Sequence, residues 1–423
     1  MNPRELLTGS FQAALGAADP LRIVPGHLPP PPRGHTVVVG AGKAAASMAR
    51  AVEDHWPADK PLSGVVATRY GHGLPLKRIR VVEAGHPVPD EQGEATAREI
   101  LSLAQGLAEE DLLLVLVSGG GSSLLALPVA GVPMADLKAV TRSLLASGAP
   151  IEDMNTVRKH LSRIQGGRLA LATRAHVLAL VISDVTGDDP THIASGPCVP
   201  DPTTYRDAID ILARFGVKPP ASIAAHLDRG VQGREPETPK PGDKAFARVD
   251  NRVIATAHAS LMAAAGFVME RGVTPMVLGD SITGEASEVA KVHAAMAREL
   301  RVHAQPFKPP VALISGGETT VTLRGKGRGG RCSEFLLSLA VSLAGLEDTW
   351  ALACDTDGID GSEDNAGAIA TPDSLARARA KGLDAKKLLA ANDGYGFFSA
   401  LGDLVVTGPT RTNVNDYRII VVR

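Results

Sequence analysis

The feature that most constrains this chain is a repeated order of apolar segment, glycine-rich turn and helix-like segment. Residues 36–39, 112–117 and 177–182 are apolar apart from Thr36, and each has about the length of one strand. A strand that is apolar on both faces is typical of a parallel sheet covered by helices on both sides. The order therefore predicts an α/β fold, with a mostly parallel sheet in the N-terminal part of the chain.

A stretch rich in proline, glycine and charge interrupts this order at residues 217–248 and is typical of a linker between domains. Largely apolar, strand-like segments resume after it at 252–254, 274–278, 311–314, 350–353 and 417–422. We therefore predict two domains, residues 1–245 and residues 246–423, the second also α/β.

The composition limits the class of partner. Lys and Arg number 44 against 46 Asp and Glu, which gives a net charge of −2 at pH 7, and aromatic residues make up 3% of the chain. Such a chain has no bulk attraction to nucleic acid or to an anionic membrane. Three cysteines without a close pair fit a reducing compartment, and the N-terminus does not resemble a secretion signal. We expect a cytoplasmic protein that binds small molecules, and the sequence leaves a homodimer open.

The turn after the first apolar segment matches the dinucleotide fingerprint G-x-G-x-x-A at Gly40, Gly42 and Ala45. The acid that binds the ribose of NAD is missing at the end of the next strand, where Arg69 would suit NADP instead. Lys43 lies inside the motif, and a cation at a helix start opposes the helix dipole. Its presence there indicates an anionic ligand.

Two loops share the pattern S-G-G-x-[ST]-[ST], at residues 118–123 and 315–320. Two tight strand exits built from small residues would explain the repeat; alternatively, both loops hold oxyanions with backbone N–H groups and hydroxyls. A third glycine-rich stretch contains Lys326, Arg328 and Arg331. A basic loop of this kind suits a polyphosphate, although a solvated flexible loop has the same composition.

Two further residues are candidates for contacts with an anionic substrate. Arg158 belongs to a basic helical stretch in which Lys159 and Arg163 share one face, where like charges repel unless an anion lies nearby. Such a face is often only solvated. His86 lies in a loop with proline and glycine, where a lone histidine is more often structural than catalytic.

Acidic residues follow two other apolar segments, at Asp184 and Asp189 and at Asp355 and Asp357. Carboxylates at the carboxyl ends of parallel strands lie where α/β sheets bind ligands, and Mg²⁺ needs only one or two of them besides substrate phosphates. Aspartate is also a common turn residue, but two such clusters together favour the metal. Phosphate loops, carboxylates and cations without a covalent nucleophile are what phosphoryl transfer requires.

These segments resemble those of the glycerate 2-kinases with a C-terminal MOFRL domain: VVVGAGKAA, EAGHPVPD, VSGGGSSLL, MNTVRKHLSRIQGGRLA, ISDVTGDDPTHIASGP, LISGGETTV, GKGRGGR, DTDGIDGSEDNAGA and GPTRTNVNDYR. The resemblance runs from about residue 37 to the end. Members of this family are also labelled hydroxypyruvate reductases in tartrate degradation. One departure is visible, because Cys332 and Ser333 stand where the family usually has Asn-Gln.

The resemblance implies a Rossmann-like N-terminal domain, a smaller α/β C-terminal domain and an active site in the cleft between them. It implies ATP-dependent phosphorylation of D-glycerate to 2-phosphoglycerate with Mg²⁺, and it places the catalytic lysine and arginine at Lys43 and Arg331. Two alternatives stay open: an NAD(P)H-dependent hydroxypyruvate reductase that uses the turn at residues 40–45, and a sensor that keeps the cleft without the chemistry.

From these arguments we predict the following site. The catalytic residues are Lys43 and Arg331, and His86 and Arg158 bind the substrate. ATP is bound by Gly40, Gly42, Ser118, Gly119, Gly120, Gly121, Ser122, Ser123, Gly316, Gly317, Lys326 and Arg328. Mg²⁺ is held among Asp184, Asp189, Asp355 and Asp357.

Overall fold

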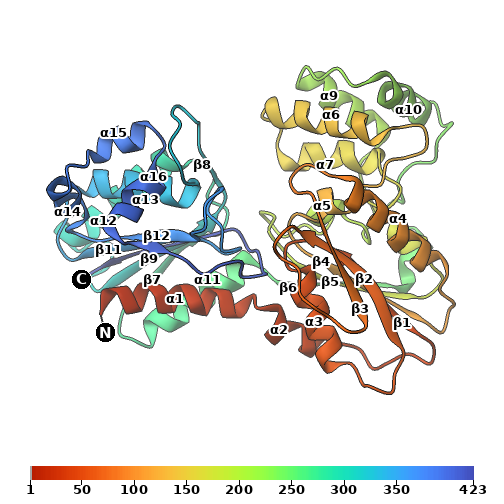
Figure 1. The fold of residues 1–423 in the computed structure, drawn as a ribbon, viewed down its shortest axis with the longest axis horizontal. Helices are drawn as coiled ribbons and strands as arrows, with labels where there is room; N and C mark the ends of the chain where they lie inside the picture. Colours follow the sequence, from red (N-terminus) through yellow and green to blue (C-terminus); the bar gives the residue numbers. More distant parts are fainter. Residues whose placement is uncertain (1) are drawn as a thin grey trace. The chain divides into compact units, whose positions relative to one another are not determined.

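The structure, a computed structural model, describes residues 2–423, which form two compact units (Figure 1). The N-terminal unit comprises Pro20–Ile254, and the C-terminal unit comprises Ala255–Arg423 together with the residues up to Asp19. This division differs from the predicted boundary after residue 245 in two respects. The first helix of the chain belongs to the C-terminal unit, and the last strand of the N-terminal sheet lies entirely after residue 245.

The sheet of the N-terminal unit has six strands, in the order β3-β2-β1-β4-β5-β6. Its strands are β1 (Thr36–Ala41), β2 (Leu62–Arg69), β3 (Ile79–Ala84), β4 (Leu112–Val117), β5 (His176–Ile182) and β6 (Val249–Ala255). The pairs β1–β2, β1–β4, β2–β3 and β4–β5 are all parallel. The predicted α/β class and mostly parallel sheet are therefore confirmed.

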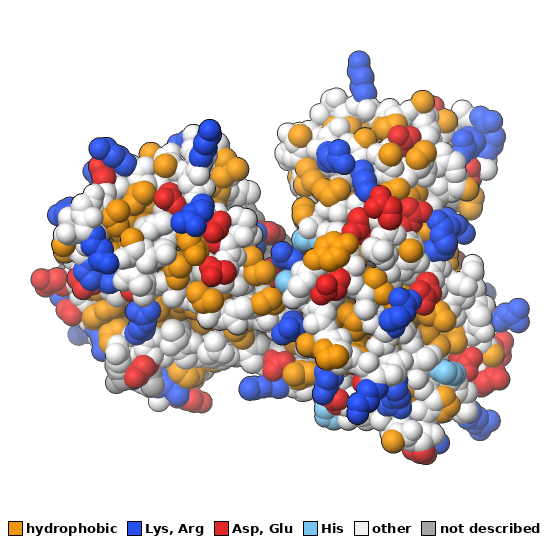
Figure 2. Space-filling model, in the orientation of Figure 1, with side chains coloured by type: hydrophobic (Ala, Val, Ile, Leu, Met, Phe, Trp, Pro, Cys, Tyr) orange, Lys and Arg blue, Asp and Glu red, His pale blue; other side chains and the backbone are white. Residues whose placement is uncertain are grey.

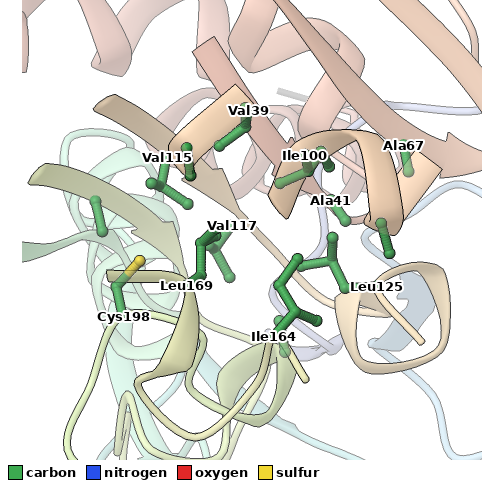
Figure 3. Close-up of a cluster of buried hydrophobic side chains, with 14 of the residues drawn as sticks. Val39, Ala41, Ala67, Ile100, Val115, Val117, Leu125, Ile164, Leu169 and Cys198 are labelled. Atoms are coloured by element: carbon green, nitrogen blue, oxygen red, sulfur yellow. The ribbon is translucent and has the colours of Figure 1, made fainter. Parts of the chain in front are cut away.

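The apolar strands are continuous because both of their faces are covered. Every residue of β1 and β4 is buried. On one face, Val39 and Val115 gather with Ile100 and Leu169 from the covering helices (Figure 3). The helices of this unit are α2 (Pro20–Ile23), η1 (Val24–His27), α3 (Ala45–His55), α4 (Glu91–Gln105), α5 (Gly121–Leu124), α6 (Met134–Ala146), α7 (Ile151–His160), α8 (Arg168–Leu171), η2 (Ile193–Ser195), α9 (Tyr205–Arg214), α10 (Ala221–Val231) and η3 (Lys244–Arg248).

Helices α6, α7, α9 and α10 form a separate layer of the N-terminal unit (Figure 1). They share a hydrophobic cluster of their own, in which Leu137, Val157 and Leu212 are buried. This layer contains the helix that bears Arg158, so it positions one of the predicted substrate contacts.

The sheet of the C-terminal unit is mixed, in the order β13-β12-β11-β14-β9-β7. Its strands are β7 (Thr274–Gly279), β9 (Val311–Gly317), β11 (Thr349–Asp355), β12 (Gly367–Ala370), β13 (Leu404–Val405) and β14 (Asp416–Val422), and a small second sheet pairs β8 (Gly284–Glu285) with β10 (Thr319–Thr320). Strand β14 is antiparallel to both β11 and β9, whereas β7 and β9 are parallel.

Alternate residues of β9 enter different cores, as the period of a strand requires. Ala312 and Ile314 pack with α1 and α11, and Leu313 packs with α12 and α13 on the other face. Helix α1 lies along α11, where Phe11 contacts Tyr417 of β14 (Figure 1). The helices are α1 (Pro3–Ala17), α11 (Ala257–Met269), α12 (Ala286–His303), α13 (Arg331–Leu343), α14 (Ser374–Ala380), α15 (Ala385–Ala390) and α16 (Gly394–Leu401).

The surface reflects the balanced composition. On the face shown in Figure 2, basic side chains alternate with acidic ones over each unit. Within residues 2–423, none of the helices combines the length and the apolar character that crossing a membrane requires.

Candidate functional site

The two glycines of the predicted dinucleotide motif are required by packing of the backbone. Strand β1 continues through Gly40, where a Cβ would lie 1.9 Å from the carbonyl oxygen of Leu116 on β4. A Cβ on Gly42 would lie 2.0 Å from Oγ of Ser118. Both positions need glycine whether or not a nucleotide binds. The predicted nucleotide contacts of Gly40 and Gly42 therefore stay predictions.

The N–H groups that this motif would offer to a pyrophosphate are already in use. Those of residues 42–45 all have acceptors within the N-terminal unit, at 2.8 to 3.1 Å. Lys43 donates to the carbonyl of Gly119, and Ala44 donates to Oγ of Ser118. A dinucleotide fingerprint works by aiming such groups at the pyrophosphate. Here they attach the turn to the loop that follows β4.

That loop, residues 118–123, brings Lys43 and His86 together over Gly120. A Cβ on Gly120 would lie 3.0 Å from Nε2 of His86 and 3.6 Å from Cγ of Lys43. The N–H groups of Gly119 and Gly120 have no acceptor among residues 2–423. Two backbone donors, an imidazole and an ammonium-bearing chain thus surround one turn, which is an arrangement suited to an oxyanion.

The same loop continues into a buried polar cluster around Asn155. Oγ of Ser122 lies 2.9 Å from Oγ of Ser195, which donates to Oδ1 of Asn155 at 3.0 Å. Arg158 donates to the same oxygen at 3.2 Å, and Nδ2 of Asn155 donates to the carbonyl of His192 at 2.9 Å. Sequence reasoning missed Asn155 and Ser195, because a neutral amide and a loop serine give no signal of their own.

In the C-terminal unit, Arg331 begins α13 and is surrounded by carboxylates. Its guanidinium donates to Asp416 at 2.7 Å and to Asp355 at 2.9 Å, and it also pairs with Glu318. Burial alone would lower the pKa of Arg331, but the charges of Asp416, Asp355 and Glu318 raise that pKa well above its ordinary value. The charge of this predicted catalytic arginine is thus compensated within its own unit. Asp416 was not among the predicted residues.

The start of α13 is occupied by the buried carboxylate of Asp360. It accepts hydrogen bonds from the N–H groups of Gly330 at 3.2 Å, Cys332 at 2.9 Å and Ser333 at 2.8 Å. The side chains of Cys332 and Ser333 are fully buried. The two residues that depart from the family's Asn-Gln pair therefore lie inside the unit, next to Arg331 in the chain.

The second S-G-G loop differs from its predicted form. Strand β9 continues through Gly316 and Gly317, which pair with Tyr417 and Asp416 of β14. The carbonyls of both glycines accept hydrogen bonds from Arg418, at 2.9 and 3.2 Å. These residues belong to a sheet and not to an open phosphate loop, because β14, which is far away in sequence, supplies a partner strand.

The predicted basic loop is anchored by close backbone contacts. A Cβ on Gly325 would lie 2.3 Å from the carbonyl oxygen of Ala391. The guanidinium of Arg328 stacks 4.7 Å from the ring centre of Tyr395, and the Lys326 side chain is exposed. Both cations face solvent, and their contact with a nucleotide stays a prediction.

Three of the four aspartates predicted to bind metal also stabilise their own turns. Asp189 accepts from the N–H of Thr191 at 2.8 Å, Asp355 from that of Asp357 at 3.0 Å, and Asp357 from that of Ile359 at 2.9 Å. Asp184 is half-buried. Within residues 2–423, no three His, Cys, Asp or Glu side chains are grouped so that they could hold a metal ion. The pair in each unit matches only the one or two carboxylates that phosphate-bound Mg²⁺ needs.

Comparison with known proteins extends this picture over the whole chain. Residues 6–228 match DUF4147, a domain of unknown function, and residues 311–416 match the MOFRL family. A protein of Pyrococcus horikoshii named glycerate 2-kinase is 42% identical over 92% of this chain and 88% of its own length. The chain belongs to the glycerate 2-kinase family.

Two other relatives provide a comparison of the fold and a second name for members of this family. A crystal structure of glycerate kinase from Thermotoga maritima matches with a TM-score of 0.88 at 38% identity, over 99% of each chain. A protein of Agrobacterium vitis, provisionally named hydroxypyruvate reductase, is 52% identical over 100% of this chain and 95% of its own length. Relatives with high identity to this chain thus carry two different names, glycerate 2-kinase and hydroxypyruvate reductase. The geometry of the site has to distinguish between these two activities.

Proposed function

We propose that the protein is an ATP-dependent kinase that converts D-glycerate to 2-phosphoglycerate. The 2-hydroxyl oxygen of D-glycerate attacks the γ-phosphorus of ATP, the bond from that phosphorus to the β–γ bridging oxygen breaks, and ADP and one proton are released. Relatives named glycerate 2-kinase or glycerate kinase support this assignment. The observation that favours it over a reductase is that the N–H groups of residues 42–45 are used within the unit and so do not form a dinucleotide cradle.

Phosphoryl transfer is accelerated mainly by positive charge near the transferred group, because its oxygens carry the negative charge of the transition state. Lys43, beside Gly120, is the cation that we propose to supply it, and His86 and the N–H groups of Gly119 and Gly120 are placed to form hydrogen bonds with the same oxygens. Arg331 is the second predicted cation, although its charge is matched by Asp355 and Asp416 in its own unit. Any contribution of Arg331 requires these carboxylates to exchange partners.

We propose Mg²⁺ as the metal, held by the oxygens of ATP and by carboxylates among the four predicted aspartates. Bound Mg²⁺ neutralises charge on the β- and γ-phosphate oxygens. Asp189 is exposed and keeps Oδ2 outside hydrogen-bond range of His192, at 3.9 Å from Nε2, so this oxygen is suited to a metal. We also propose a cytoplasmic location, as expected from the composition.

The first test supplies the purified protein with ATP, Mg²⁺ and D-glycerate and follows ADP, with the phosphorylated carbon identified by phosphorus NMR. We expect 2-phosphoglycerate, and no oxidation of NADH or NADPH with hydroxypyruvate. Oxidation of either cofactor without ADP formation would reverse the assignment.

The second test concerns Lys43. The Lys43→Ala variant should lose about 100- to 1,000-fold in kcat, the usual effect of removing one group that stabilises transition-state charge. The matched control is Lys60→Ala, an exposed lysine of the same unit, which should keep full activity. Thermal unfolding of both variants checks that the fold is retained. An active Lys43→Ala enzyme would remove Lys43 from this role.

A further inference from the structure

Arg158 is a half-buried cation without a compensating carboxylate. Its guanidinium donates to the neutral amide oxygen of Asn155, and within residues 2–423 it forms no ion pair. Burial lowers the pKa of Arg158 to about 10, and no neighbouring charge opposes that effect. The adjacent Lys159, by contrast, pairs with Asp201 at 2.9 Å. An unpaired cation in such a place is costly, and a ligand that brings the missing charge would remove the cost.

The Arg158 side chain lines a small hollow at the surface of the N-terminal unit, where such a ligand would meet it. The polar residues Ser122, Ser162 and Gln165 also line it, together with apolar residues such as Leu127 and Leu137.

Asn155 holds the arginine in position without neutralising it. Its Oδ1 accepts from Arg158 and Ser195, and its Nδ2 is fixed by the carbonyl of His192. An aspartate there would cancel the charge, whereas the amide leaves it available. The pattern is that of a preorganised anion site.

The hollow borders the Lys43–His86 group through two shared loops. Ser122 and Ser123 line the hollow, and Oγ of Ser123 donates to the carbonyl of Gly120, over which Lys43 and His86 lie. Pro89, three residues after His86, also lines it. A carboxylate bound in the hollow would therefore lie next to the loop that carries the predicted phosphoryl site.

We propose that Arg158 binds the carboxylate of the acceptor and thereby selects short 2-hydroxy acids. This inference rests on the proposed kinase function.

The test measures binding separately from turnover. Calorimetry without ATP compares D-glycerate with the neutral D-glyceramide on the wild type, on Arg158→Gln and on a control, Arg163→Gln. Arg163 is exposed and lies five residues along the same basic stretch. We expect the wild type and the control to prefer the acid by about 100-fold, and Arg158→Gln to lose this preference, as the loss of a bidentate charged contact predicts.

Two further measurements distinguish ligand binding from a structural role. In turnover, Arg158→Gln should raise the KM for D-glycerate about 100-fold and leave the KM for ATP unchanged. Ligand-free Arg158→Gln should unfold at the same temperature as the wild type or higher, since an uncompensated cation is removed. Arg158→Lys, which keeps the charge but not the planar geometry, should bind the acid about tenfold more weakly than the wild type.

The outcomes separate the two proposals. Unchanged preference for the acid in Arg158→Gln, or in Arg158→Lys if the first variant does not fold, overturns the role of Arg158 and leaves the kinase assignment intact. Arg158-dependent binding of the acid by a wild-type protein that forms no ADP overturns the kinase assignment and supports the carboxylate site.

Discussion

Glu334 offers a pH-dependent test of the packing in the C-terminal unit. Its carboxyl group, on α13, is 5% exposed and accepts a hydrogen bond from Nδ2 of Asn392 at 3.2 Å. Oδ1 of Asn392 in turn accepts from the N–H groups of Arg324 at 2.7 Å and Gly325 at 3.1 Å. Burial raises the pKa of Glu334 to about 7, and nearby Glu285 adds to the effect, while Asn392 and Arg324 oppose it.

The sign of the effect on stability follows from proton binding. Between the ordinary pKa of 4.5 and the value of about 7, the folded chain holds more protons on Glu334 than the unfolded chain. The contribution is therefore complete below pH 4.5 and is lost as the pH rises through 7. The full difference corresponds to about 3 kcal/mol, and we expect about 2 kcal/mol because the side chain borders a hollow that admits water.

The perturbation is Glu334→Gln, which keeps the shape and the acceptor for Asn392 but cannot ionise. The assay is urea unfolding across about pH 5 to 8.5, in a Trp56→Phe background so that Trp350 alone reports on the C-terminal unit. The variant should match the parent near pH 5 and exceed it by about 2 kcal/mol near pH 8.5.

The matched control is Glu288→Gln, at an exposed residue that lines the same hollow. This variant should have the same free energy of unfolding as the parent at both pH 5 and pH 8.5. A difference between Glu334→Gln and its parent that is constant with pH, or that grows toward acid, would refute the reasoning.

Two further predictions concern buried groups. Lys159 and Asp201 form an ion pair with side chains 1% and 0% exposed, so Lys159→Met should lower the free energy of unfolding by about 3–5 kcal/mol in urea titrations, and a loss below about 1 kcal/mol would contradict it. Cys198, Cys332 and Cys354 are buried, and burial raises the pKa of each thiol, so none should react with a thiol reagent before urea unfolds the chain; rapid labelling of the native protein would show otherwise.

The strands of the central sheets could be predicted because burial on both faces leaves a local signature. The apolar segments at 112–117 and 177–182 become β4 and β5 with boundaries within one residue of the prediction. Within a parallel sheet each residue of a strand meets a covering helix, so the hydrophobic run itself marks the strand. The overall class followed from the order of such runs.

The roles of the loops could not be predicted in the same way, because they depend on partners distant in sequence. In the sequence, the motif at Gly40 and Gly42 fits a dinucleotide site. In the structure, N–H groups of this turn donate instead to Ser118 and Gly119. In the sequence, Gly316 resembles a loop residue. In the structure it pairs with β14, which follows about a hundred residues later. A sequence motif indicates the backbone conformation of a turn. Whether the N–H groups of that turn are available to a ligand depends on the segments that pack against it.

Two of the predicted arginines show that a basic residue in the sequence does not by itself provide a free charge for a ligand. Arg331 and Arg158 both lie in basic stretches, but the first meets three carboxylates and the second meets a neutral amide. Net charge governs attraction of an anion at short range, so the surroundings of Arg158 favour one and those of Arg331 do not, unless its carboxylates are drawn away. A divalent cation on Asp355 would do this, since it would compete for the oxygen that Arg331 now occupies. If Asp355 bound a divalent cation, Arg331 would lose one of its three carboxylate partners, and its charge would become more available to an anion.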